Sequence, residues 1–145
     1  MFTKFITFLK FEEQLVSELV RLSERQQKAL VNNNIKELEE ITSYQVELQK
    51  NLRKAEDQRM TILATWLNIN RSMAASLKLS DLAKYLKKNE MKELIIVQNN
   101  FENLIARLMN LNTINRVLLN RARNGIREML DFLTNGTQNV CNIRI

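Results

Sequence analysis

The sequence contains no proline and no histidine, and it has only two glycines and one cysteine among 145 residues. Because proline removes a backbone donor and interrupts helices, its absence fits long helices joined by a few short breaks. Hydrophobic residues make up 45% of the chain, enough for a continuous apolar core in an elongated bundle. The composition therefore predicts an all-α fold in a single domain.

The chain also lacks the residues that common catalytic and metal sites need. Without histidine it has neither the commonest general base nor the commonest metal ligand. Cys141 alone cannot build a zinc site, and no histidine is present to activate it. Glycines only at Gly125 and Gly136 exclude a glycine-rich phosphate loop. We expect no enzyme activity, no cofactor and no metal, and a lone cysteine favours a reducing cytoplasm.

No membrane-spanning or cleaved segment is expected. The first ten residues resemble the start of a signal peptide, but Lys10 and the pair Glu12 and Glu13 end the apolar run, and no small-residue cleavage site follows. No run of about 18 apolar residues occurs. The net charge of +6 is mostly spread among alternating acids and bases, as in residues 50–59. A solvated helix face is the favoured interpretation, with an acidic protein partner and nucleic acid or membrane as alternatives.

The main element is predicted at residues 89–133, where apolar residues recur in steps of three and four on one helical face. This stripe consists of Leu94, Val97, Phe101, Leu104, Leu108, Leu111, Leu118, Ala122, Ile126, Met129 and Leu133. The helix would be about 65 Å long, which exceeds what a compact core requires. Gly136 is expected to end it, leaving residues 137–145 as a polar tail outside a domain of residues 1–136.

Two further helices are predicted before it, at residues 8–31 and 35–65. Residues 32–34 are three asparagines, and Asn34 followed by Glu37 is typical of a helix start. So short a break predicts an antiparallel hairpin.

The second helix carries a heptad in which spacings of three and four alternate without a slip. Its members are Leu38, Ile41, Gln45, Leu48, Leu52, Ala55, Arg59, Ile62 and Trp66. This is the pattern of a coiled-coil seam, and we expect the long helix to close the bundle against it. Gln45 and Arg59 either fix the register of the seam or extend from its edge to solvent, which is the favoured interpretation for Arg59.

Between the heptad and the long helix, residues 66–79 show no steady period. A short helix at residues 80–87 is expected to cover the end of the bundle, with Leu82, Ala83 and Leu86 inward and Asn89 capping the next helix. The predicted architecture is an elongated antiparallel helical bundle, or coiled-coil hairpin, with one long C-terminal helix and a short connecting helix.

The middle of the long helix has an apolar face wider than one seam requires. Ile114 and Val117 lie about 120° from the main stripe and extend it beside Leu111 and Leu118. Such a face fits an amphipathic partner helix, another helix of the same chain or a dimer mate.

Polar residues surround that face. Asn112 and Asn115 either set the register within the core or bind a partner's backbone. Arg116, Arg123 and Arg127 either steer an acidic segment or form a solvated face.

Several short motifs occur in one order over nearly the whole chain. They are Glu18-Leu19 with Gln27-x-Ala29-Leu30, the helix start from Asn34 to Leu38, Glu56-x-x-Arg59-x-x-Ile62-Leu63, the small-residue patch Ala74 to Leu79 leading into Leu82, and Asn112-x-x-Asn115-x-x-Leu118-Leu119. Together they resemble the FlgN family of flagellar export chaperones. The chain departs from the family in its basic charge and in a tail beyond Gly136 without a family signature.

The resemblance implies a cytoplasmic chaperone of the flagellar type III export system. Such proteins bind the C-terminal segments of hook-filament junction (hook-associated) proteins and hold them soluble for delivery to the export apparatus. The C-terminal helix is the part usually credited with binding, so the candidate partner-binding residues are Leu111, Asn112, Ile114, Asn115, Arg116, Val117, Leu118 and Arg123.

Two other functions are considered. The first is a coiled-coil scaffold that forms a homo-oligomer through the long helix. The second is a basic nucleic-acid binder, which is disfavoured because the sequence shows no helix-turn-helix and no aromatic stacking platform.

Overall fold

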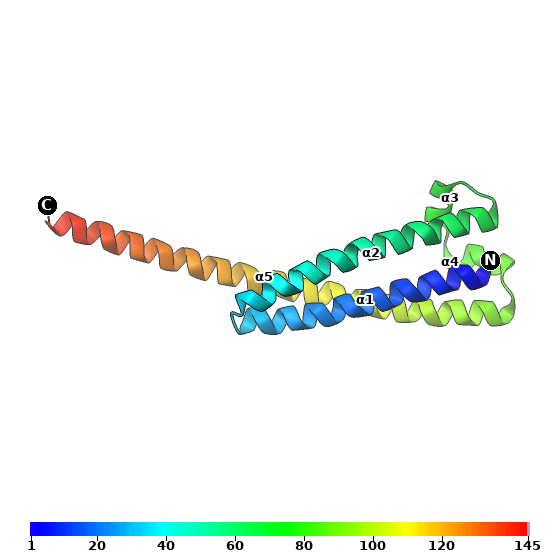
Figure 1. The fold of residues 1–145 in the computed structure, drawn as a ribbon, viewed down its shortest axis with the longest axis horizontal. Helices are drawn as coiled ribbons and strands as arrows, with labels where there is room; N and C mark the ends of the chain where they lie inside the picture. Colours follow the sequence, from blue (N-terminus) through cyan, green and yellow to red (C-terminus); the bar gives the residue numbers. More distant parts are fainter. Residues whose placement is uncertain (145) are drawn as a thin grey trace.

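A computed structural model describes the backbone of residues 1–144 and the side chains of residues 1–135. The described part consists of helices joined by short connections and contains no strand. Its elements are α1 (Phe2–Val31), α2 (Ile35–Leu67), α3 (Arg71–Ser76), α4 (Leu79–Leu82), the 3-10 turn η1 (Ala83–Tyr85) and α5 (Lys88–Arg144). Figure 1 shows an elongated bundle with the C-terminal part of α5 projecting from one end. The predicted all-α fold class is confirmed.

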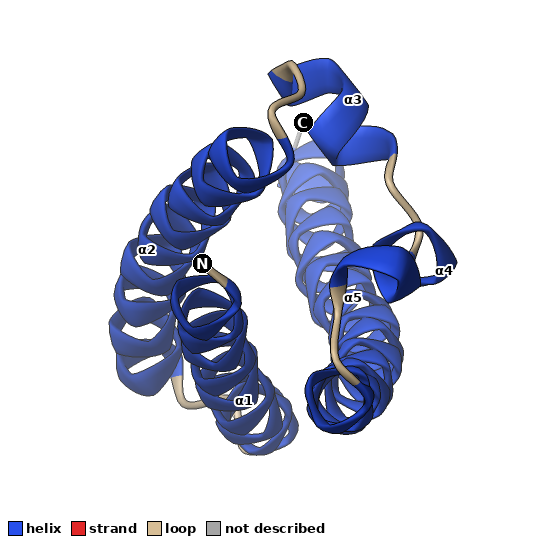
Figure 2. Cartoon of the chain, turned by 90° about the vertical axis from the view of Figure 1, so that its right-hand side faces the viewer, coloured by secondary structure: helices blue, strands red, loops and turns tan. Residues whose placement is uncertain are grey.

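Helix α1 lies between the other two long helices. It packs against α2 on one side and α5 on the other (Figure 2). α2 runs antiparallel to α1, as predicted, while α5 runs parallel to it (Figure 1). The expectation that the long helix packs against the heptad of α2 is wrong. Adjacent buried pairs in α1, such as Leu15-Val16 and Leu19-Val20, point about 100° apart and so fill both interfaces.

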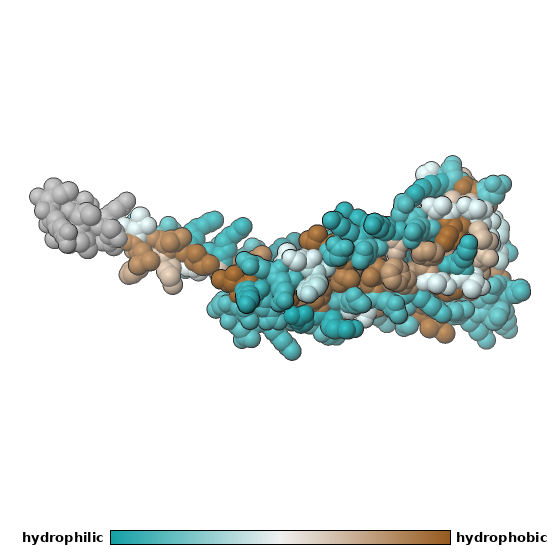
Figure 3. All heavy atoms as spheres, in the orientation of Figure 1, coloured by the Kyte–Doolittle hydropathy of each residue, from teal (hydrophilic) through white to brown (hydrophobic). Residues whose placement is uncertain are grey.

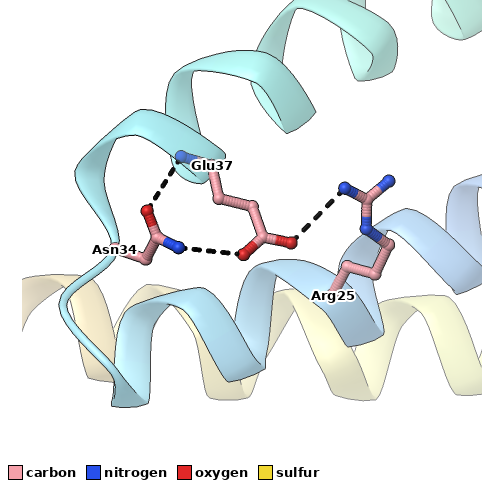
Figure 4. Close-up of polar contacts among 3 residues, drawn as sticks. All are labelled: Arg25, Asn34 and Glu37. Atoms are coloured by element: carbon pink, nitrogen blue, oxygen red, sulfur yellow. Dashed lines mark hydrogen bonds and ion pairs between the residues drawn. The ribbon is translucent and has the colours of Figure 1, made fainter.

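The turn between α1 and α2 has the predicted helix start. The Glu37 N–H donates to Asn34 Oδ1 at 3.2 Å, and Asn34 Nδ2 donates to Glu37 Oε2 at 3.2 Å (Figure 4). Arg25 of α1 pairs with the same carboxylate, which joins the two helices next to the turn. Asn33 adopts a φ of 53°, a left-handed conformation that asparagine tolerates better than most residues.

The heptad of α2 is confirmed by burial. Ile41 and Ala55 are buried, and the remaining heptad members are half-buried. The helix ends at Leu67, where Asn68 takes a left-handed φ of 54°. This end lies within two residues of the predicted one.

The first helix begins at Phe2, six residues before the predicted start at 8. The early start is stabilised because Phe2 and Phe5 bury their rings against Trp66 of α2, with centroid distances of 6.4 Å and 6.0 Å. Both belong to an apolar cluster at the closed end of the bundle. The cluster consists of Phe2, Phe5, Ile6, Leu63, Ala74, Leu82, Leu94 and Val97.

The connection from α2 to α5 covers that cluster, with more helical structure than predicted. α3 was not expected; its start is capped by Asn70, whose Oδ1 accepts the Met73 N–H at 2.9 Å. In place of one helix at 80–87, the chain forms α4 and η1. Leu82 is buried and Leu86 half-buried, as predicted, but Ala83 is exposed.

Both ends of α5 differ from the prediction. The helix begins at Lys88, so Asn89 lies inside it, and the Lys87 N–H donates to Glu90 Oε1 at 2.9 Å. At the other end α5 continues through Gly136 to Arg144, so the predicted helix end is wrong. Glycine lowers helix stability by about 1 kcal/mol but does not by itself stop a helix. The side chains of residues 136–145, Cys141 included, lie outside those described, and the division into domain and tail stays a prediction.

Candidate partner-binding surface on the long helix

Helix α5 contacts α1 through a heptad of its own, here called the α1–α5 seam. Its members are Leu94, Val97, Phe101, Leu104, Leu108, Leu111, Asn115, Leu118 and Ala122, all buried or half-buried. Spacings of three and four alternate along this series, which is the geometry that keeps two nearly parallel helices in continuous contact. Asn115 occupies a seam position and does not interrupt it.

From Leu119 onward the large apolar residues of α5 are exposed. We call Leu119, Ile126, Met129 and Leu130 the distal face; they follow one another in steps of seven, three and one and share one side of the helix. Figure 3 shows apolar side chains gathered on this projecting part. The expectation that Ile126, Met129 and Leu133 close the bundle is wrong, because all three are exposed and α1 ends at Val31.

Arginines line one border of the distal face. Arg116, Arg123 and Arg127 lie seven and four residues apart, which places them on one edge of α5; we call them the arginine edge. All three are exposed, and none forms an ion pair with another described residue. Arg107, earlier on the same helix, pairs instead with Glu24 of α1. The projecting end of α5 thus carries a row of positive charge that no described acidic side chain pairs with.

A cluster of polar side chains joins the three long helices where α5 leaves the bundle. Asn115 Nδ2 donates to the Ser23 carbonyl oxygen at 2.9 Å and to Gln26 Oε1 at 3.1 Å, and Gln45 Nε2 of α2 donates to the same Gln26 oxygen at 3.2 Å. Ser23 Oγ donates to Asn112 Oδ1 at 3.4 Å. We call these five residues the polar layer.

Asn115 is only 5% exposed, and its Oδ1 accepts no hydrogen bond from any described protein group. A buried acceptor without a partner costs about 1–3 kcal/mol. Of the two interpretations of Asn115 left open by the sequence, the structure shows the buried amide within the core.

The predicted partner-binding residues fall into three classes of accessibility. Leu111 and Asn115 are buried against α1, and Ile114 and Leu118 are half-buried. The exposed members are Asn112, Arg116, Val117 and Arg123. A partner docking on the bundle as it stands can therefore touch only part of the set. Their role in binding stays a prediction.

The most deeply buried ion pair of the described residues joins Arg59 to Glu12, and the sequence pattern did not predict it. Arg59 does not extend to solvent: its Nε donates to Glu12 of α1, and the two side chains are 18% and 3% exposed. Burial raises the pKa of Glu12 above its ordinary value of 4.5, against the opposing effect of the hydrogen bond from Arg59. Glu12 lies seven residues after Phe5 and four before Val16, so helical spacing alone already placed it in the interface.

A second candidate site is an open pocket of about 330 Å³ near the closed end of the bundle, with both apolar and polar side chains in its lining. Side chains of α1, α2, α5 and the α3–α4 connection line it, among them Leu9, Met60 and Phe101.

The described residues hold no group of three or more acidic, cysteine or histidine side chains able to bind a metal. No described helix is long and apolar enough to cross a membrane.

Comparison with protein families gives one result. The family described as FlgN protein matches residues 1–142, which include all of the α1–α5 seam, the distal face and the polar layer. No significant match is found among curated proteins or among solved structures.

Proposed function

This chain belongs to the FlgN family of flagellar export chaperones, and we propose that it binds the C-terminal segments of hook-filament junction (hook-associated) proteins through the projecting part of α5. Binding would keep these subunits soluble in the cytoplasm until they reach the export apparatus. The family is one of chaperones, so the proposed activity is recognition of a polypeptide and not a chemical reaction.

The distal face is the observation that carries this proposal. It continues the α1–α5 seam past the end of α1, so the surface that binds one helix inside the chain is exposed over the next turns. An amphipathic helix recognises such a surface through anchors at helical spacing. We propose that the cargo segment is helical when bound and packs on α5 where α1 no longer does.

The distal face is too small to account for tight binding alone. Burying four side chains of this size contributes about 6–12 kcal/mol, at roughly 1.5–3 kcal/mol each. Association itself costs about 4–15 kcal/mol, so the two terms nearly cancel. Additional contacts are needed. The arginine edge supplies one source, and it favours a cargo segment with acidic residues beside its apolar anchors.

Two variants on the same helix test the proposal. Ile126 of the distal face and Ile96 of the bundle are each 61% exposed. In calorimetric titrations with the C-terminal fragment of a hook-associated protein, Ile126→Asp should weaken binding at least tenfold, whereas Ile96→Asp should leave it unchanged. The proposal fails if the folded parent chain, checked by circular dichroism, forms no complex, or if both variants bind equally well.

A scaffold protein that dimerises through α5 is the second candidate, because an exposed distal face also fits a second copy. The charge of this region disfavours it. Residues 116–131 contain four arginines, Arg116, Arg121, Arg123 and Arg127, against Glu128 and Asp131. Two copies would therefore bring like charges together. A tight homodimer in sedimentation equilibrium at micromolar concentration, lost in Ile126→Asp, would favour the scaffold.

A further inference from the structure

The contacts that join α5 to α1 change in chemistry along the seam. Near the start of α5, Leu94 and Val97 are buried in the apolar cluster at the closed end. At the other end the helices are joined by the hydrogen bonds of the polar layer. There Asn115 donates to Ser23 and Gln26, but its own oxygen has no protein donor. The buried seam residues are therefore apolar at the closed end, whereas the end next to the distal face contains a buried amide beside Leu111.

Amide contacts exchange partners more readily than apolar ones. A hydrogen bond lost on opening is replaced by one to water or to another chain, whereas exposed apolar surface has no such replacement. Elements with few buried apolar contacts open at lower free energy than the rest of a fold. In the C-terminal half of the seam Leu111 is the buried apolar member, while Leu118 and Ala122 are half-buried and Asn115 is an amide. The exposed distal helix beside this half provides an end from which opening can begin.

The α1–α2 hairpin is held by contacts that do not involve α5. Glu12 pairs with Arg59 inside the hairpin, and Arg25 pairs with Glu37 next to the turn. Release of α5 from α1 near residue 115 would leave both contacts intact. The hairpin thus remains folded while part of the seam opens.

We propose that cargo binding opens the C-terminal half of the α1–α5 seam, and that the cargo helix replaces α1 along Leu111, Asn115 and Leu118. This inference rests on the proposed function. Opening the seam would lengthen the apolar surface offered to the cargo. The distal face alone is too small for tight binding. In the closed protein, Asn115 acts as a positioning residue that holds α5 in register.

Chemical crosslinking of the seam tests the proposal directly. In a Cys141→Ser chain, Ser23→Cys and Asn112→Cys place two thiols across the polar layer, where the native side chains are 3.4 Å apart. The matched control, Lys10→Cys with Glu93→Cys, joins the same two helices near the closed end, where the native ion pair is 2.7 Å long. Both pairs are joined with a short bis-maleimide, and binding of a hook-associated C-terminal fragment is measured before and after.

We expect the link at 23–112 to weaken binding at least tenfold and the link at 10–93 to leave it unchanged. Equal binding before and after the 23–112 link would overturn the inference while leaving the proposed function intact, and so would an equal loss from both links. Absence of binding before any link is formed would instead contradict the proposed function.

A substitution at the centre of the polar layer gives an independent test. Asn115→Leu places an apolar side chain at a seam position, which should raise the midpoint of thermal unfolding and weaken cargo binding at least tenfold, because the closed form becomes harder to open. If Asn115 served only to hold the fold together, stability would change without a matching loss of affinity. That result would overturn the inference.

Discussion

The carboxylate of Glu12 and the guanidinium of Arg59 form an ion pair inside the α1–α2 interface, with side chains only 3% and 18% exposed. Arg59 occupies a heptad position of α2 that would ordinarily hold an apolar residue. Removing one partner of a buried pair leaves the other charge uncompensated, whereas replacing both by apolar residues is often neutral. Each residue of the pair therefore stabilises the fold only while the other is present.

Arg59→Met should lower the free energy of unfolding by about 3–5 kcal/mol, because the Glu12 carboxylate is left buried without its partner. Adding Glu12→Leu to this variant should recover most of the loss. Urea denaturation of the parent, both single variants and the double variant measures the coupling. A double variant as unstable as Arg59→Met alone would show that the packing of the arginine stem, and not its charge, stabilises the interface.

The raised pKa of Glu12 predicts a pH dependence of stability. Burial is its main cause, so the folded chain holds the Glu12 proton more tightly than the unfolded chain does. As the pH rises past the ordinary value of 4.5, the unfolded chain loses this proton first, and stability falls until the folded chain has lost it too.

Glu12→Gln removes this titration. The unfolding free energy of the parent minus that of Glu12→Gln should therefore decrease as the pH rises past 4.5. Urea denaturation over a series of pH values measures the difference. An increase with pH would mean that the attraction of Arg59 outweighs the cost of burial.

Gly125 should be replaceable by alanine with a gain in helix stability. A Cβ at this position meets no atom within 4 Å, and no described glycine has a positive φ. Gly125→Ala should stabilise the projecting helix locally by about 1 kcal/mol, seen as slower amide hydrogen exchange around residue 125. The exposed neighbour Asn124 provides the control, since Asn124→Gly should speed exchange there. Faster exchange in Gly125→Ala would contradict the expectation.

The arginine edge should affect the rate of cargo binding more than the lifetime of the complex. The double variant Arg116→Gln with Arg123→Gln should slow association and reduce its dependence on salt, because exposed charges act mainly on the encounter. Arg21 and Arg53 are also exposed but lie outside the projecting helix. Replacing those two by glutamine removes the same net charge and serves as the control in stopped-flow measurements. Equal effects of both double variants would assign the salt dependence to net charge alone.

Local patterns predicted the local structure well. The heptad of α2 and the helix start at Asn34 depend on residues close in the chain, and both were found where the sequence placed them. The role of Asn115 was more difficult to predict. Asn115 already lies on the apolar stripe of α5 at the ideal helical period. The sequence left open whether its amide is buried or free for a partner, because the two residues that accept from it, Ser23 and Gln26, are 92 and 89 positions away in the chain.

The pairing of helices was not evident from the sequence, because any of the three long helices offers an apolar stripe to the others. What decides it is that α1 is apolar on two faces, through adjacent pairs such as Leu15-Val16. The same lack of long-range information led to the wrong interpretation of Arg59, since its partner Glu12 is 47 residues away in the chain.

The projecting α5 makes the molecule a rod with a slender extension (Figure 1). At 1.5 Å per residue, the 57 residues of α5 extend about 86 Å, far more than the diameter of a compact chain of this mass. Friction depends on shape, so a single copy will diffuse slowly and elute from a gel-filtration column at the volume of a much heavier globular protein. Light scattering or sedimentation equilibrium, which report mass directly, is the appropriate way to count copies in solution and in the cargo complex.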